Sequence, residues 1–169
     1  MDSKRQSEIF SQWLQQHKGI LFKIIRVYAD SEEDQEDLFQ EVSVQLWRSI
    51  PSFKGESKAS TWVYRIALSH ALKWTRKEKR RNSNLGNAQD TIQVISQEHE
   101  VNPRLDWLYD QIAKLDKVDR SLCLLLFDGY QYQEIAEMIG ISENYVGVKL
   151  NRIKKYLMEQ AKKNIENGF

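Results

Sequence analysis

An acidic run early in the chain holds the residues most able to do metal chemistry. Seven carboxylates fall between Asp30 and Glu41, with no basic residue among them. Two or three converging carboxylates could hold a hard cation such as Mg²⁺ for the cleavage of nucleic acid. However, the four candidate ligands cannot all converge from one helix, and the three histidines show no ligand spacing. A solvated helix face and a docking face for a basic partner protein are the other two interpretations. We expect no metal, no other cofactor and no enzymatic activity. The four candidate ligands are Asp34, Glu36, Asp37 and Glu41.

A second group of residues, between positions 53 and 81, interleaves aromatic and basic side chains. Such a mixture suits unpaired nucleic acid, because bases stack on rings while cations hold the backbone. The alternative is that Trp62 and Ile66 belong to the core, and that the basic run at the end complements a helix dipole. Both interpretations apply in part. The group consists of Phe53, Trp62, Tyr64 and Trp74 with Lys54, Lys58, Arg65, Lys73, Arg76, Lys77, Lys79, Arg80 and Arg81.

A third candidate site is a helix-turn-helix within residues 131–158. The spacing predicts a short helix over 133–139, a sharp turn at Gly140 and a second helix capped by Ser142. An apolar stripe would hold the second helix to its domain, while the opposite side offers polar and cationic groups to a major groove. An ordinary helical hairpin with a solvated face is the plainer alternative. The stripe is Val146, Leu150, Ile153 and Leu157; the opposite side is Asn144, Val148, Asn151, Arg152 and Lys155, with Lys149 at its flank.

Length and composition limit the classes of protein that remain. The 169 residues, 41% of them hydrophobic, fit one medium domain or two small ones with a real core. A single cysteine, Cys123, cannot form an internal disulfide, which favours a reducing cytoplasm. No window approaches about 20 consecutive apolar residues, and the N-terminus lacks the apolar run of a signal peptide. We therefore expect a cytoplasmic protein without a membrane partner.

The formal net charge of +1 conceals strongly charged blocks. Residues 51–81 carry nine basic and two acidic residues, and residues 142–169 carry six and three. Residues 1–50 carry six basic and nine acidic residues. This asymmetry indicates separate surfaces for separate partners, with the basic blocks available to phosphate backbones.

The elements that must position these groups are predicted to be helical throughout. Apolar spacing predicts helices over 6–28, from a Ser31 cap to about Ile50, and over 61–79 with Ser60 or Thr61 as cap. Residues 80–103 are rich in Asn, Gln and Ser and indicate a linker, with a short strand or helix at 91–95 as an option. Two further helices precede the helix-turn-helix, the second of them opened by Asp116. The fold class is all-α: two small helical domains, 1–81 and 105–169, joined by a flexible linker, 82–104.

The three motifs together resemble the extracytoplasmic-function group of bacterial sigma factors, of the sigma-70 type. DQEDLFQEVSVQLWR is similar to the core-binding helix of that family, FKGESKASTWVYRIALSHALKWTRKEKR to its promoter-melting segment, and YQEIAEMIGISENYVGVKLNRIKKYL to its C-terminal helix-turn-helix. The resemblance covers nearly the whole chain. It implies a non-enzymatic initiation factor, made of a region 2-like and a region 4-like domain, that binds core RNA polymerase and directs it to promoters.

The resemblance also implies roles for particular residues. The acidic helix would grip the clamp helices of the polymerase, and the segment after it would capture a flipped base and face the melted strand of the downstream (−10) element. The second domain would read the upstream (−35) element as duplex and contact the polymerase flap. The polymerase-binding residues would be Asp37, Gln40, Glu41, Gln45 and Trp47. The melting residues would be Phe53, Lys54, Ser57, Lys58, Tyr64, Arg65, Ser69, Lys73, Arg76, Lys77 and Arg80. The duplex-reading residues would be Asn144, Tyr145, Val148, Lys149, Arg152 and Lys155.

Two positions depart from the family pattern. Ser69 stands where members often carry Asn, and Gly147, Val148 and Lys149 replace a frequent Lys-Ser-Arg run. Glycine costs about 1 kcal/mol of helix propensity and removes a cation, which would weaken reading of the upstream element. We therefore expect recruitment by another DNA-bound protein as a further partnership. An anti-sigma factor is a separate expected partner. The nearest alternative function is a stand-alone helix-turn-helix regulator of transcription. The first domain argues against it, because such a regulator has no need of a melting segment.

Overall fold

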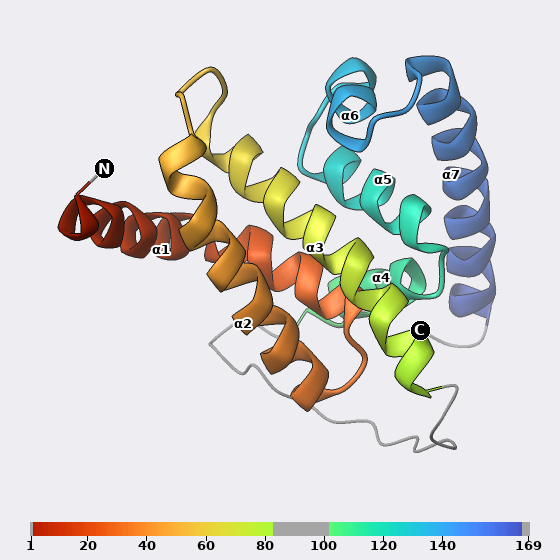
Figure 1. Cartoon of the computed structure of the whole chain (residues 1–169). Coiled ribbons are helices and arrows are strands. Elements are labelled where there is room, and N and C mark those ends of the chain that lie inside the picture. Colours follow the sequence, from red (N-terminus) through yellow and green to blue (C-terminus); the bar gives the residue numbers. More distant parts are fainter. Residues whose placement is uncertain (1, 83–101, 167–169) are drawn as a thin grey trace. The chain divides into compact units, whose positions relative to one another are not determined.

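The computed structural model describes residues 2–82 and 102–166, with side chains for 2–75 and 102–166. Every regular element in these ranges is a helix (Figure 1), as the all-α prediction requires. The chain divides into two compact units. Unit 1 contains α1 to α3 and unit 2 contains α4 to α7. The predicted option of a strand or helix at 91–95 lies outside the described residues.

Unit 1 is a bundle of three long helices. They are α1 (Ser3–Tyr28), α2 (Glu32–Ser49) and α3 (Ala59–Asn82), with a short 3₁₀ turn, η1 (Ile50–Ser52), after α2. All three helices pack against one another. Helix α1 bends at His17, whose backbone φ of −115° and ψ of 16° interrupt the regular helix. Helix α3 begins two residues earlier than predicted, so Ser60 and Thr61 lie inside its first turn and do not cap it.

The core of unit 1 follows the predicted apolar stripe of α2. Leu38, Val42 and Leu46 are each at most 1% exposed, and Ile50 of η1 continues the same stripe. The Ser31 cap is confirmed: its Oγ accepts a hydrogen bond from the backbone N–H of Asp34 at 3.1 Å. Because one side of α2 is used for this packing, its other side is left for a different purpose.

Unit 2 consists of four shorter helices. They are α4 (Pro103–Ala113), α5 (Lys117–Phe127), α6 (Tyr132–Ile139) and α7 (Glu143–Glu166). Helices α5, α6 and α7 pack against one another, and α4 packs on α5. Pro103 and Arg104, predicted to belong to the linker, are the first residues of α4. Asn102 caps that helix by accepting hydrogen bonds from the N–H groups of residues 104 and 105.

The helix-turn-helix prediction is confirmed in its local details. Gly140 ends α6 with a φ of 80°, a left-handed conformation that favours glycine. Ser142 caps α7 by accepting a hydrogen bond from the N–H of Tyr145 at 3.2 Å. Val146, Leu150 and Ile153 are at most 3% exposed and hold α7 to the unit. The face opposite this stripe is therefore the outward face of α7.

Within the described ranges, no helix is long and apolar enough to cross a membrane.

Candidate nucleic-acid interface

Helix α2 carries six of the seven acidic residues that the sequence singled out, and three of them, Glu33, Glu36 and Asp37, are exposed. Asp37 and Gln40 are exposed, while Glu41 and Gln45 are half-buried. Trp47 is also half-buried: its ring packs edge-on against Phe10 of α1, with 5.5 Å between ring centroids. Burial and the nearby Lys73 lower the pKa of His70 on α3, and the Glu41 carboxylate opposes them with a smaller raising effect. The five predicted polymerase-binding residues therefore share one helix but differ in accessibility.

Two exposed apolar residues on α2 were missed by the prediction. Phe39 is 38% exposed and Val44 is 46% exposed. Val44 follows Asp37 and Gln40 at helical spacing, so the exposed face of α2 mixes polar and apolar groups. The signal was present in the sequence, because both residues lie off the stripe of Leu38, Val42 and Leu46.

Helix α3 presents an exposed polar and cationic line. Arg65, Ser69 and Lys73 recur every four residues and all three are exposed. A spacing of four places side chains on one helix face. Lys54 and Lys58, in the loop before α3, are exposed as well, and Ser57 is half-buried. The side chains of Arg76, Lys77 and Arg80 lie outside the described residues.

The aromatic residues of this segment belong largely to the core, which corrects the stacking interpretation. Tyr64 is 0% exposed and Trp74 is 5% exposed. The expectation that Tyr64 faces a melted strand is therefore wrong, because a fully buried ring offers no face to an unpaired base. It was wrong because α3 packs on both α1 and α2, so positions on more than one side of it are enclosed.

Phe53 is fixed by two tryptophans. Its ring centroid lies 5.1 Å from that of Trp13 and 5.5 Å from that of Trp62. The indole Nε1 of Trp62 donates a hydrogen bond to the hydroxyl of Ser49 at 3.0 Å. Phe53 thus anchors the start of the loop to α1 and α3, and the exposed cations Lys54 and Lys58 follow from this fixed point.

Helix α7, which we call the recognition helix, presents a continuous outward face. Tyr145 is 47% exposed and Val148 is 44% exposed. Asn144, Asn151, Arg152 and Lys155 are exposed too. These residues recur at helical spacing along two turns and more, so a major groove could meet several of them at once. The predicted duplex-reading residues are brought together, with the exception of Lys149.

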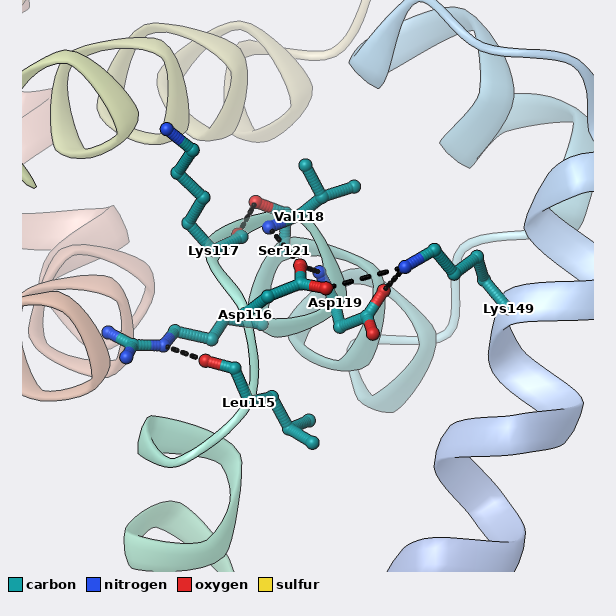
Figure 2. A network of polar contacts seen from close by, with 8 residues as sticks. Leu115, Asp116, Lys117, Val118, Asp119, Ser121 and Lys149 are labelled. Carbon is teal, nitrogen blue, oxygen red and sulfur yellow. Dashed lines mark hydrogen bonds and ion pairs between the residues drawn. The ribbon is translucent and has the colours of Figure 1, made fainter. Parts of the chain in front are cut away.

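Lys149 points away from this outward face and toward the start of α5, as Figure 2 shows. Its Nζ lies 2.9 Å from Oδ1 of Asp119 and 3.4 Å from Oδ2 of Asp116. The hydrogen bond to Asp119 is the main cause of a raised pKa for Lys149. Burial opposes ionisation of Asp116, yet the Asp119 backbone N–H and the Lys149 ammonium outweigh it and lower the pKa of Asp116. Lys149 is therefore held as a cation within unit 2.

Among the residues that the structure describes, no group of three or more His, Cys, Asp or Glu side chains could hold a metal ion. The arrangement on α2 therefore gives no support to the nuclease interpretation of the acidic run. The physical reason is that Asp34, Glu36, Asp37 and Glu41 belong to one helix and lie on more than one side of it, so all four cannot converge on one ion.

Comparison with known proteins identifies the families that the two parts of the chain match. Residues 13–81 match the family Sigma-70 region 2, and residues 105–157 match the family Sigma-70, region 4. RNA polymerase sigma factor YlaC of Bacillus subtilis is 29% identical over 140 residues, covering 79% of this chain and 81% of that protein. The ECF RNA polymerase sigma-E factor of Haemophilus influenzae is 24% identical over 169 residues, covering 92% and 87%.

A solved structure shares the fold. The sigma factor RpoE of Bartonella quintana, in complex with the anti-sigma factor NepR, superposes with a TM-score of 0.75 at 19% identity, covering 92% of this chain and 98% of that one. The chain therefore belongs to the sigma-70 family of RNA polymerase sigma factors, in its extracytoplasmic-function group. Members of this family bind core RNA polymerase and promoter DNA and act in transcription initiation.

Proposed function

We propose that this chain is an initiation factor that docks on the clamp helices of core RNA polymerase through α2, helps to melt the downstream element through α3, and reads the upstream element through α7. The observation that supports the proposal is that α2, α3 and α7 each present a different set of exposed side chains. Docking draws on the exposed Asp37 and Gln40, the half-buried Glu41, Gln45 and Trp47, and the apolar Phe39 and Val44.

Melting requires that an unpaired strand be held once its bases are released. Extruding a base costs a few kcal/mol, which a basic channel and a specific pocket can offset. Arg65, Ser69 and Lys73 line one exposed face of α3, and Lys54 and Lys58 lie in the loop that precedes it. Because Tyr64 is buried, we assign the holding of the strand to these polar and cationic groups and to the basic run that follows.

Reading of the upstream duplex is assigned to the outward face of α7. Arg152 and Lys155 suit phosphates or guanine edges, Asn144 and Asn151 suit adenine edges, and Val148 suits a thymine methyl group. Contact with the polymerase flap is assigned to the same unit. A stand-alone regulator would need the face on α7 but would leave the faces on α2 and α3 without a use.

The deciding experiment is pull-down with purified core RNA polymerase. We expect the full chain to be retained by core polymerase in the absence of DNA. Failure to bind core would leave the stand-alone regulator as the better description. Run-off transcription by the reconstituted holoenzyme on genomic DNA, with mapping of start sites, would then identify the promoters.

An anti-sigma factor is the further partner that we propose. The Bartonella quintana sigma factor of the same fold is bound to the anti-sigma factor NepR. Co-purification of the tagged chain from its native host, followed by a competition assay against core polymerase, would test this partner. A co-purified protein that leaves core binding unchanged would argue against it.

A further inference from the structure

The side chain of Lys149 is partly enclosed, although its neighbours on the recognition helix are exposed. Lys149 is 19% exposed at the side chain, and its partner Asp119 is 16% exposed. One residue before Lys149, Val148 is 44% exposed. The ammonium group and both carboxylates lie in the junction between α7 and the start of α5 (Figure 2).

We infer that Lys149 is a positioning residue, which ties the recognition helix to the N-terminus of α5, and that it does not contact DNA. The inference rests on the proposed reading of duplex DNA by α7. It changes the role of a residue that sequence resemblance assigns to the duplex itself.

The fixed position of one carboxylate supports this role. Asp116 is the N-cap of α5, and its Oδ1 accepts hydrogen bonds from the N–H groups of Val118 and Asp119, both at 3.0 Å. Its other oxygen, Oδ2, faces the ammonium of Lys149. Because the cap holds Asp116 in place, it cannot follow Lys149 toward a phosphate. Moving the lysine to DNA would therefore leave the Asp119 carboxylate, which is 16% exposed, without its cation, and an uncompensated, partly buried charge is costly.

The same ammonium group also bears on an exposed aromatic residue. Lys149 Nζ lies 5.9 Å from the centroid of the Tyr145 ring, one helical turn earlier on α7. A cation at that distance is attracted by the face of the ring. Lys149 therefore joins the α5 carboxylates to a ring on the outward face, and it holds both the helix and Tyr145 in one orientation.

The test is a salt series of holoenzyme binding to a fluorescent duplex that contains an upstream element mapped by run-off transcription. Each lysine that contacts a phosphate contributes about 0.9 to the slope of log affinity against log salt concentration. We expect Lys149→Met to weaken binding about three- to tenfold at one salt concentration, as for the loss of a partly buried ion pair, while leaving the slope unchanged. Lys155→Met is the matched control, because Lys155 is an exposed lysine on the same helix. Its slope should fall by about 0.9.

A second variant, Asp119→Asn, should change the affinity for duplex DNA in opposite directions depending on whether Lys149 contacts DNA or positions the helix. Asp119→Asn removes a negative charge that would repel DNA or compete for Lys149. If Lys149 contacts phosphate, Asp119→Asn should tighten binding. If Lys149 is a positioning residue, Asp119→Asn should weaken binding, and the double variant with Lys149→Met should be no weaker than the single lysine variant. Asp116→Asn keeps the N-cap, because Asn caps as well as Asp, and it should weaken binding in the same direction.

The outcomes separate the inference from the proposed function. A slope that falls by about 0.9 in Lys149→Met, together with tighter binding by Asp119→Asn, would overturn the inference and leave the duplex-reading role of α7 intact. If Lys155→Met and Arg152→Ala both left the affinity for the duplex unchanged, the proposed reading function of α7 would fail instead. Lys149→Arg should bind as the native chain does, and circular dichroism shows whether each variant keeps its helical fold.

Discussion

Gly147 leaves a helix interior without a side chain, at a point on α7 where the structure has room for one. A Cβ added there would lie 3.7 Å from two carbons of the Tyr132 ring, which is an ordinary van der Waals distance. We predict that Gly147→Ala stabilises the protein against urea by about 1 kcal/mol, from helix propensity alone. Gly140→Ala is the matched control and should destabilise, because its φ of 80° disfavours a side chain. Urea unfolding followed by circular dichroism checks both, and a loss of stability in Gly147→Ala would contradict the prediction.

Cys123 provides a second prediction at the scale of a residue. Burial, with a smaller contribution from the Asp119 carboxylate, raises the pKa of the Cys123 thiol from 9.0 to about 12. At pH 8 the folded protein should not react with a thiol reagent such as DTNB, because the thiolate is the reactive form. Between about pH 9 and 12 the unfolded chain releases a proton that the folded chain keeps, so stability falls as pH rises. The loss approaches about 1.4 kcal/mol per pH unit, and Cys123→Ala should lack it.

At the scale of the element, adjacent residues of α2 lie on different faces, one buried in the core and one exposed. Leu38 is fully buried, while Phe39, the next residue, is 38% exposed. We predict that Phe39→Ala and Val44→Ala each weaken binding to core polymerase by about 1 kcal/mol, or roughly fivefold in Kd, with little change in unfolding. Leu38→Ala should instead lower the free energy of unfolding by about 2 to 5 kcal/mol, because it leaves a cavity in the core. Equal effects of Phe39→Ala and Leu38→Ala on unfolding would contradict the division of α2 into two faces.

Helix boundaries were predicted correctly where the signal came from residues adjacent to the boundary. Ser31, Asp116 and Ser142 were recognised as caps because each directly precedes an apolar periodic run. In the structure each accepts a hydrogen bond from a backbone N–H two or three residues later. The start of α3 was misplaced, because two adjacent cap residues, Ser60 and Thr61, both favoured a later start than Ala59, where the helix begins. Tyr64 was misassigned because burial from two sides depends on α1 and α2, which are distant in sequence.

At the scale of the whole molecule, the two units are expected to carry separable binding functions. We predict that the double change Asp37→Ala and Glu41→Ala weakens core binding and leaves the intrinsic affinity for promoter duplex nearly unchanged. Arg152→Ala should do the reverse, at a cost of about 1 to 3 kcal/mol in duplex affinity. Fluorescence titrations with core polymerase and with duplex DNA measure the two effects separately. Similar losses of core binding in both variants would contradict the assignment.

The near-neutral charge of the chain follows from this arrangement. The basic excesses of residues 51–81 and 142–169 are offset by acidic residues elsewhere, many of them on or beside α2. The net charge of +1 is thus a sum over surfaces proposed for different partners.

The amino-acid sequence alone determined the helical fold class, the caps at Ser31, Asp116 and Ser142, the turn at Gly140 and the apolar stripes of α2 and α7, because each depends on residues within a few positions of one another. It also pointed to the sigma factor family, through three motifs in order. The tertiary structure decided which side chains are available to partners: it encloses Tyr64, exposes Phe39 and Val44, and directs Lys149 to two carboxylates about 30 residues away in sequence. Those outcomes depend on packing between helices, and periodicity within one helix carries no information about the neighbour on its other side.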